Sequence, residues 1–119
     1  MATIHLTKGG FEKRVASMDS ISGEWKFLGS RPALIDFYAS WCGPCKALSP
    51  IIDDLAEEFD GKVDIYKVNV DDEQELARAF GIRSIPTLLF IPLVGEPKKT
   101  MGAMPQNALR EVLNDMIKQ

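Results

Sequence analysis

Apolar and polar residues along the chain follow two periodicities that predict strands and helices in alternation. Short runs that alternate, or that are almost continuously apolar, are typical of strands, and apolar positions three and four apart are typical of helices. The predicted strands are residues 3–7, 33–39, 62–70, 87–91 and 98–102. The predicted helices are 8–18, a long segment after Cys42 that ends at Gly61, 71–82 and 105–119. This order predicts an α/β fold, with a central mixed β-sheet and helices on both faces.

Two segments depart from regular patterns. Pro50 lies inside the long helix, where its ring and its missing N–H predict a kink. Residues 19–32 are rich in turn-forming residues around Trp25 and Phe27. We expect this stretch to be an irregular connection whose aromatic side chains pack on the rest of the protein.

The composition narrows the classes of function. The chain has 119 residues, 45% of them apolar and 26% charged, so we treat residues 1–119 as a single folded domain. A net charge of −3 disfavours nucleic acid or an anionic membrane as the main partner. No apolar run reaches the roughly 18 residues of a membrane span, and the first residues do not resemble a signal peptide. We expect a monomer in the cytoplasm; a periplasmic location is the alternative if a leader was removed.

The two cysteines, Cys42 and Cys45, are separated only by Gly43 and Pro44. A cysteine at the start of a helix lies where unpaired N–H groups and the helix dipole favour the thiolate, which is the attacking species in disulfide exchange. Cys45, one turn later, can then resolve the mixed disulfide. Pro44 suits the first helical turn, where no N–H is needed. The spacing therefore predicts a pair that cycles between dithiol and disulfide.

Two other uses of this cysteine pair are weaker. A tetrahedral zinc site usually needs four ligands, and besides the cysteines the chain offers one histidine, His5, which is distant in sequence. A purely structural disulfide would close a loop too short to constrain the unfolded chain strongly. We therefore expect neither a metal nor a bound cofactor.

The motif WCGPCK, which follows the strand ALIDFYA, resembles the active site of the thioredoxin family, and GIRSIPTLLF resembles its cis-proline segment. The resemblance extends from Ile4 to the end of the chain. It implies the thioredoxin fold and a thiol–disulfide oxidoreductase that reduces disulfides in client proteins. Cys42 would attack the substrate disulfide, and Cys45 would resolve the intermediate. A flavin- and NADPH-dependent thioredoxin reductase would then reduce the protein again.

Asp36 is the one acid in the apolar strand 33–39. The resemblance implies that it lies buried beneath the cysteines, where burial raises the pKa of its carboxyl toward neutrality. A base with such a pKa can take the proton from Cys45. Lys67 matches a lysine that lies near this acid in the family and would moderate its charge. The alternative, an acid that faces water from an edge strand, is disfavoured by its apolar neighbours.

The resemblance also implies a substrate-binding rim built from three loops. Pro86 would carry a cis peptide bond that holds the backbone of Ile85 beside Cys42, whereas the alternative is a trans proline that opens a strand. Trp41 is expected to be exposed rather than part of the core. The apolar rim suits flexible disulfide segments of many proteins. Its expected members are Trp41, Gly43, Pro44, Ile85, Pro86, Gly102 and Ala103.

Some residues depart from the family pattern. Tyr38 stands where many members have tryptophan, and Ser84 replaces a glycine common before the Ile–Pro pair. The segment between Val15 and Ala33 is longer than in the plainest members. Two rival functions stay open: an exported disulfide oxidant or isomerase, and a non-redox binding subunit with the same fold.

Overall fold

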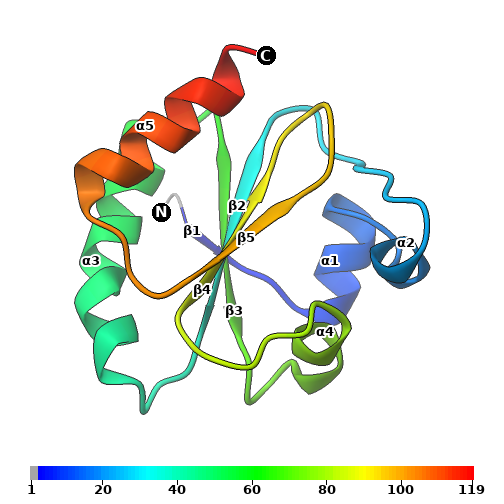
Figure 1. Cartoon of the computed structure of the whole chain (residues 1–119), viewed down its shortest axis with the longest axis horizontal. Helices are drawn as coiled ribbons and strands as arrows, with labels where there is room; N and C mark the ends of the chain where they lie inside the picture. The colour runs from blue at the N-terminus through cyan, green and yellow to red at the C-terminus, as the bar shows by residue number, and fades with distance from the viewer. Residues whose placement is uncertain (1–2) are drawn as a thin grey trace.

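A five-stranded mixed sheet forms the centre of the computed structural model, which describes residues 3–119 (Figure 1). The strands are β1 (Thr3–His5), β2 (Ala33–Tyr38), β3 (Asp64–Asn69), β4 (Thr87–Ile91) and β5 (Lys98–Met101), in the spatial order β1-β3-β2-β4-β5. β3 runs parallel to both β1 and β2, whereas β4 is antiparallel to β2 and to β5. The predicted mixed sheet is therefore confirmed.

Helices cover both faces of this sheet, as the sequence predicts. The helices are α1 (Lys8–Arg14), α2 (Met18–Ser22), α3 (Gly43–Glu58), α4 (Gln74–Ala79) and α5 (Gln106–Ile117). Figure 1 shows α3 and α5 on one side of the sheet and α1, α2 and α4 on the other. In the described part of the chain, none of these helices has the length and apolar character needed to cross a membrane.

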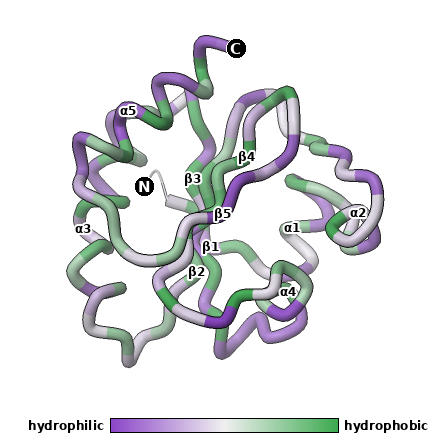
Figure 2. The backbone as a smooth tube through the Cα atoms, viewed as in Figure 1, coloured by the Kyte–Doolittle hydropathy of each residue, from purple (hydrophilic) through white to green (hydrophobic). Residues whose placement is uncertain are grey.

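The core consists of two apolar layers, one on each face of the sheet. Successive residues of a strand point to opposite faces, so Leu34 packs toward α3 and α5, whereas Ile35 and Phe37 pack toward α1 and α4. Figure 2 shows that hydrophobic residues concentrate on the central strands. Because β2 is covered on both sides, its run is almost continuously apolar, and each fully buried side chain of this kind stabilises the fold by about 1.5–3 kcal/mol.

The segment 19–32 differs from its prediction. We expected an irregular connection, but α2 forms over Met18–Ser22. Ser17 caps this helix, because its hydroxyl accepts a hydrogen bond from the backbone N–H of Ser20 at 3.3 Å. The rest of the segment is irregular, and Trp25 and Phe27 pack against the core layer beneath α1 and α4, as predicted.

The strand directions gather three loops at one edge of the sheet. β2 ends at Tyr38 and leads to Cys42 at the start of α3. Because β4 is antiparallel to β2, its first residue, Thr87, pairs with Phe37 near that end. Thr87 also pairs with Met101, the last residue of β5. The segments around residues 41–45, 84–86 and 102–103 therefore meet at this edge, although they are distant in sequence.

Candidate active site

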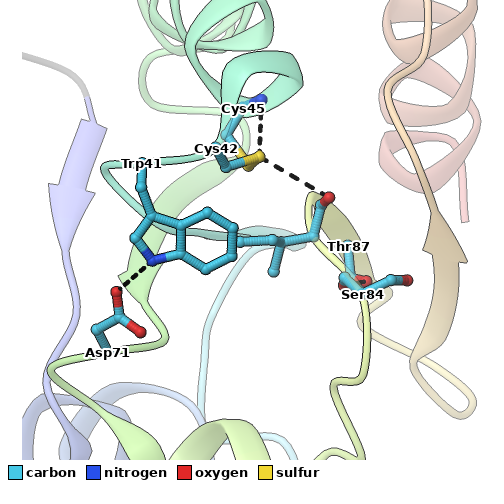
Figure 3. Close-up of a disulfide and its surroundings, with 7 residues drawn as sticks. Trp41, Cys42, Cys45, Asp71, Ser84 and Thr87 are labelled. Carbon is cyan, nitrogen blue, oxygen red and sulfur yellow. Dashed lines mark hydrogen bonds between the residues drawn. A yellow bond between two sulfur atoms is a disulfide. The ribbon is translucent and has the colours of Figure 1, made fainter.

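Cys42 and Cys45 form a disulfide at the amino end of α3 (Figure 3). Cys42 is the N-cap residue, and its sulfur accepts a hydrogen bond from the backbone N–H of Cys45 at 3.2 Å. Pro44 lies in the first turn of α3, where backbone N–H groups have no hydrogen-bond partner within the helix, so its missing N–H costs no hydrogen bond. The predicted placement of Cys42 at a helix start is confirmed, and the unpaired N–H groups there favour negative charge on its sulfur.

Access to the disulfide is narrow. Cys42 exposes 5% of its surface and Cys45 exposes 3%. The sulfur of Cys42 lies 3.8 Å from the carbonyl oxygen of Ile85, which comes from the loop before β4 (Figure 3). A substrate sulfur must therefore approach across the surrounding loops, and Cys42 is the less enclosed of the two sulfur-bearing residues.

The loops around the disulfide are joined by specific backbone contacts. The Ile85–Pro86 peptide bond is cis, as predicted. The hydroxyl of Thr87 donates to the carbonyl of Ser84 at 2.6 Å, which closes the turn around this bond. The N–H of Gly102 donates to the carbonyl of Pro86 at 2.8 Å, and Gly102 has a φ of +91°, a backbone conformation that glycine adopts without strain.

Most members of the expected rim reach the surface. Gly43, Pro44 and Ala103 are exposed, and Ile85 and Gly102 are half-buried. Pro86, by contrast, is buried beneath these residues. It therefore shapes the rim from below and adds little surface to it.

Trp41 is 69% exposed, as predicted for a residue outside the core. Its indole N–H donates to the carboxylate of Asp71 at 2.8 Å (Figure 3). The backbone N–H of Asp71 in turn donates to the side-chain oxygen of Asn69 at 2.9 Å. Sequence reasoning did not identify Asp71, since nothing in its surroundings along the chain indicates a tryptophan partner 30 residues away.

Asp36 is only 1% exposed, so the alternative of an acid that faces water is wrong. Burial raises the pKa of its carboxyl from 3.8 to about 6; the charge of Lys67 lowers this pKa, and the charge of Asp53 raises it. Within the described residues, neither carboxylate oxygen of Asp36 has a hydrogen-bond partner. A buried carboxyl with this pKa can hold or release a proton near neutral pH.

Lys67 is the direct neighbour of Asp36 in the parallel pair β2–β3, as the resemblance implies, and it is 9% exposed. Its ammonium donates to the hydroxyl of Ser49 at 2.7 Å and lies 5.2 Å from the centroid of the Tyr38 ring. The lysine is thus near the acid but directs a hydrogen bond to α3. Sequence reasoning missed Ser49, which looks like an ordinary helix residue.

A cavity of about 240 Å³ connects these groups. Asp36, Cys45, Ser49 and Lys67 line it together with Tyr38, Ala39, Ser40 and Lys46. Because several polar side chains line this otherwise apolar cavity, and because its volume exceeds that of a water molecule, it can admit water between Asp36 and Cys45.

His5, considered above as a zinc ligand, lies on β1, and its ring packs edge-on against Tyr38 at a centroid distance of 6.4 Å. Across residues 3–119, no group of three or more His, Cys, Asp and Glu side chains is arranged to hold a metal ion.

Comparisons with known proteins bear on both fold and site. The thioredoxin family model matches residues 2–115. The chain is 45% identical over 112 residues to a thioredoxin of Borreliella burgdorferi. This aligned region covers 94% of this chain and 95% of that protein. It is 42% identical over 114 residues to a thioredoxin of Haemophilus influenzae, with 96% of each chain covered.

A crystal structure of chloroplastic thioredoxin z superposes with a TM-score of 0.79 at 25% identity, covering 100% of this chain and 97% of that one. This neighbour confirms the predicted thioredoxin fold. The family match, the close relatives and the Cys42–Cys45 disulfide together show that the chain belongs to the thioredoxin family, and that it is a thiol–disulfide oxidoreductase of the protein-disulfide reductase type.

Proposed function

We propose that the protein reduces disulfides in client proteins, with Cys42 as the attacking sulfur and Cys45 as the resolving sulfur. The observation that carries this assignment is the N-cap position of Cys42, whose sulfur accepts the Cys45 backbone N–H at 3.2 Å. In the reduced protein the same N–H and the helix terminus would stabilise a Cys42 thiolate. Cys45 lies within the first turn and lacks this position.

In the first step the Cys42 thiolate attacks one sulfur of the substrate disulfide. A mixed disulfide forms between Cys42 and the substrate, the substrate S–S bond breaks, and the second substrate sulfur leaves as a thiolate that takes a proton from water. The carbonyl of Ile85, 3.8 Å from the Cys42 sulfur, marks where an extended substrate segment would lie.

In the second step Asp36 acts as the base for Cys45. The Cys45 thiol gives its proton to the Asp36 carboxylate through water in the shared cavity, and the resulting thiolate attacks the sulfur of Cys42. The Cys42–Cys45 bond forms, and the bond to the substrate breaks. The substrate has then gained two electrons, and the protein is oxidised. A carboxyl with a pKa of about 6 suits this task, because it is ionised at neutral pH yet still basic.

The rim would bind substrates through apolar surface and backbone. Trp41, Gly43, Pro44, Ile85 and Ala103 offer accessible surface around the disulfide. Pro86 supports them from below, and Gly102 holds the third loop against it. A small apolar surface of this kind recognises many flexible segments without a strict sequence requirement.

The oxidised protein would be reduced again by a flavin- and NADPH-dependent thioredoxin reductase, so the chain itself needs no cofactor. We infer a cytoplasmic location, because a dithiol that must be regenerated suits a compartment that keeps thiols reduced. We also infer a monomer and a single domain over residues 1–119, because the site draws on β2, α3, β4 and β5 of one chain and needs no second copy.

The two cysteines can be tested separately by mixing each reduced variant with insulin after dithiothreitol has been removed. Cys45→Ser should accumulate a mixed disulfide with the substrate, because the first attack proceeds without resolution. Cys42→Ser should form none. The reverse pattern would exchange the two roles. Equilibration with glutathione tests the direction of the reaction: a potential as high as that of strong oxidants would contradict the reductase assignment.

A further inference from the structure

We propose that Ser49 is a positioning residue, whose hydroxyl holds the Lys67 ammonium away from the Asp36 carboxylate and so sets the strength of that carboxylate as a base. The proposal rests on the role proposed above for Asp36. Ser49 lies outside the WCGPCK motif, and it acts through Lys67 without touching the substrate or the reacting sulfurs.

The first observation is an opposite-charge pair that is not hydrogen-bonded. Asp36 and Lys67 are direct partners in the parallel pair β2–β3, so their side chains leave the sheet on the same face. Neighbouring strand positions with opposite charges ordinarily attract each other. Yet neither oxygen of Asp36 has a hydrogen-bond partner among residues 3–119. The ammonium of Lys67 must therefore be held elsewhere.

The second observation identifies what holds it. The Lys67 ammonium donates to the Ser49 hydroxyl at 2.7 Å, a short distance for such a bond. It also lies 5.2 Å from the centroid of the Tyr38 ring, within the range of a cation–π contact. Ser49 is four residues after Cys45 in α3, so both side chains lie on one helix face and line the same cavity.

The consequence for Asp36 is electrostatic. A direct ion pair with Lys67 would favour the ionised carboxylate and lower its pKa, which would weaken it as a base for Cys45. With the ammonium on Ser49, burial remains the largest influence and the pKa of Asp36 stays raised, at about 6. Lys67 then moderates the charge without capturing the carboxylate.

Other charged or titratable groups surround this pair, on β1, β2, α3 and the segment between β3 and α4. They are His5, Tyr38, Cys45, Lys46, Asp53, Asp72 and Glu73. On β4, the residue opposite Asp36 is the apolar Leu88. None of these groups accepts a hydrogen bond from the Lys67 ammonium within the described chain, so Ser49 is the residue whose removal should release it.

The test is a titration of the Asp36 carboxyl by NMR in the oxidised protein, where both cysteines are held in the disulfide and do not titrate. Ser49→Ala should lower the midpoint by about one pH unit, as expected when an opposite charge moves next to a carboxylate. Ser49→Thr keeps the hydroxyl and should restore the wild-type midpoint. An unchanged or raised midpoint in Ser49→Ala would overturn the proposal.

Two controls isolate the route through Lys67. Ser40→Ala removes another hydroxyl from the wall of the same cavity, one that accepts no bond from Lys67, and should leave the midpoint unchanged. In a Lys67→Met background, Ser49→Ala should cause no further shift. A shift of the same size in that background would show that Ser49 does not act through the lysine, and the proposal would fail.

A kinetic measurement separates this inference from the role of Asp36. The rate at which Cys45 resolves a mixed disulfide is followed against pH in wild type and in Ser49→Ala. In Ser49→Ala the midpoint of this rate profile should move to lower pH by the same amount as the midpoint of the NMR titration. If the titration shifts and the kinetic profile does not, the positioning by Ser49 is supported, and the assignment of Asp36 as base is contradicted.

Discussion

Trp41 donates its indole N–H to Asp71 across 2.8 Å, a contact between residues 30 positions apart that fixes the orientation of the most exposed aromatic ring beside the disulfide. The ring remains open to solvent, while one edge is tied to the loop after β3 (Figure 3). A side chain held in one orientation loses less conformational entropy when it binds a partner. We therefore expect the contact to prepare the proposed rim for substrate.

Removal of this tether should affect binding more than chemistry. Asp71→Ala is expected to raise the KM for a protein disulfide several-fold, because a free indole must be ordered when the substrate binds, at a cost of about 0.5–1.5 kcal/mol. Asp71→Asn keeps an acceptor oxygen for the indole N–H and should retain most of the wild-type KM. Steady-state insulin reduction measures both. A change confined to the resolving step would contradict this role.

The stability of the protein should depend on pH through Asp36. The pKa of this carboxyl is raised from 3.8 to about 6 in the folded protein, so between these values the folded state holds a proton that the unfolded chain releases. The stabilisation that this bound proton provides is complete below pH 3.8, the pKa of the carboxyl in the unfolded chain. It is lost as pH rises through about 6, the pKa in the folded protein. Asp36→Asn should therefore be more stable than wild type above pH 6, by up to about 3 kcal/mol.

Urea unfolding of the oxidised proteins on both sides of the Asp36 pKa provides the measurement. The advantage of the Asn variant should grow as pH rises through this range, because other carboxyls titrate equally in both proteins. If the difference in the free energy of unfolding is constant with pH, the pKa of Asp36 is not raised.

The same substitution should separate the two chemical steps. Without a base, Asp36→Asn should slow the attack of Cys45 on the mixed disulfide by a factor on the order of 10², the lower end of what a positioned base contributes. The first attack by Cys42 needs no such proton transfer and should be nearly unchanged. Single-turnover kinetics resolve the two phases. Equal losses in both phases would argue for a general structural effect.

The core layer under α1 and α4 should depend strongly on Phe11. This side chain is fully buried and packs edge-on against Phe80 at a centroid distance of 5.6 Å. Phe11→Ala should lower the free energy of unfolding by about 3–5 kcal/mol, because it leaves a cavity in a packed layer. Leu28→Ala, at an exposed apolar position, should change it by only about 0.5 kcal/mol. Denaturant unfolding of both variants tests the contrast.

Features that depend on neighbours along the chain were predictable from the sequence. The strands β2 and β4 follow from their apolar runs, and the helix start at Cys42 follows from the Gly43–Pro44 spacing, because a cap acts on N–H groups two or three residues away. α2 was missed because five residues are too few to show an apolar period, and its start rests on the local bond between Ser17 and Ser20.

The sequence by itself determined the cysteine pair, the buried strand with one acid in it, and the family to which the chain belongs. Tertiary structure alone decided that Trp41 is tied to Asp71 and that Lys67 donates to Ser49 instead of Asp36. The physical reason is distance along the chain. These contacts join segments that only the strand order β1-β3-β2-β4-β5 and the packing of α3 bring together. The long side chain of Lys67 can adopt many directions, so the acceptors near it in the folded protein decide which hydrogen bond it makes.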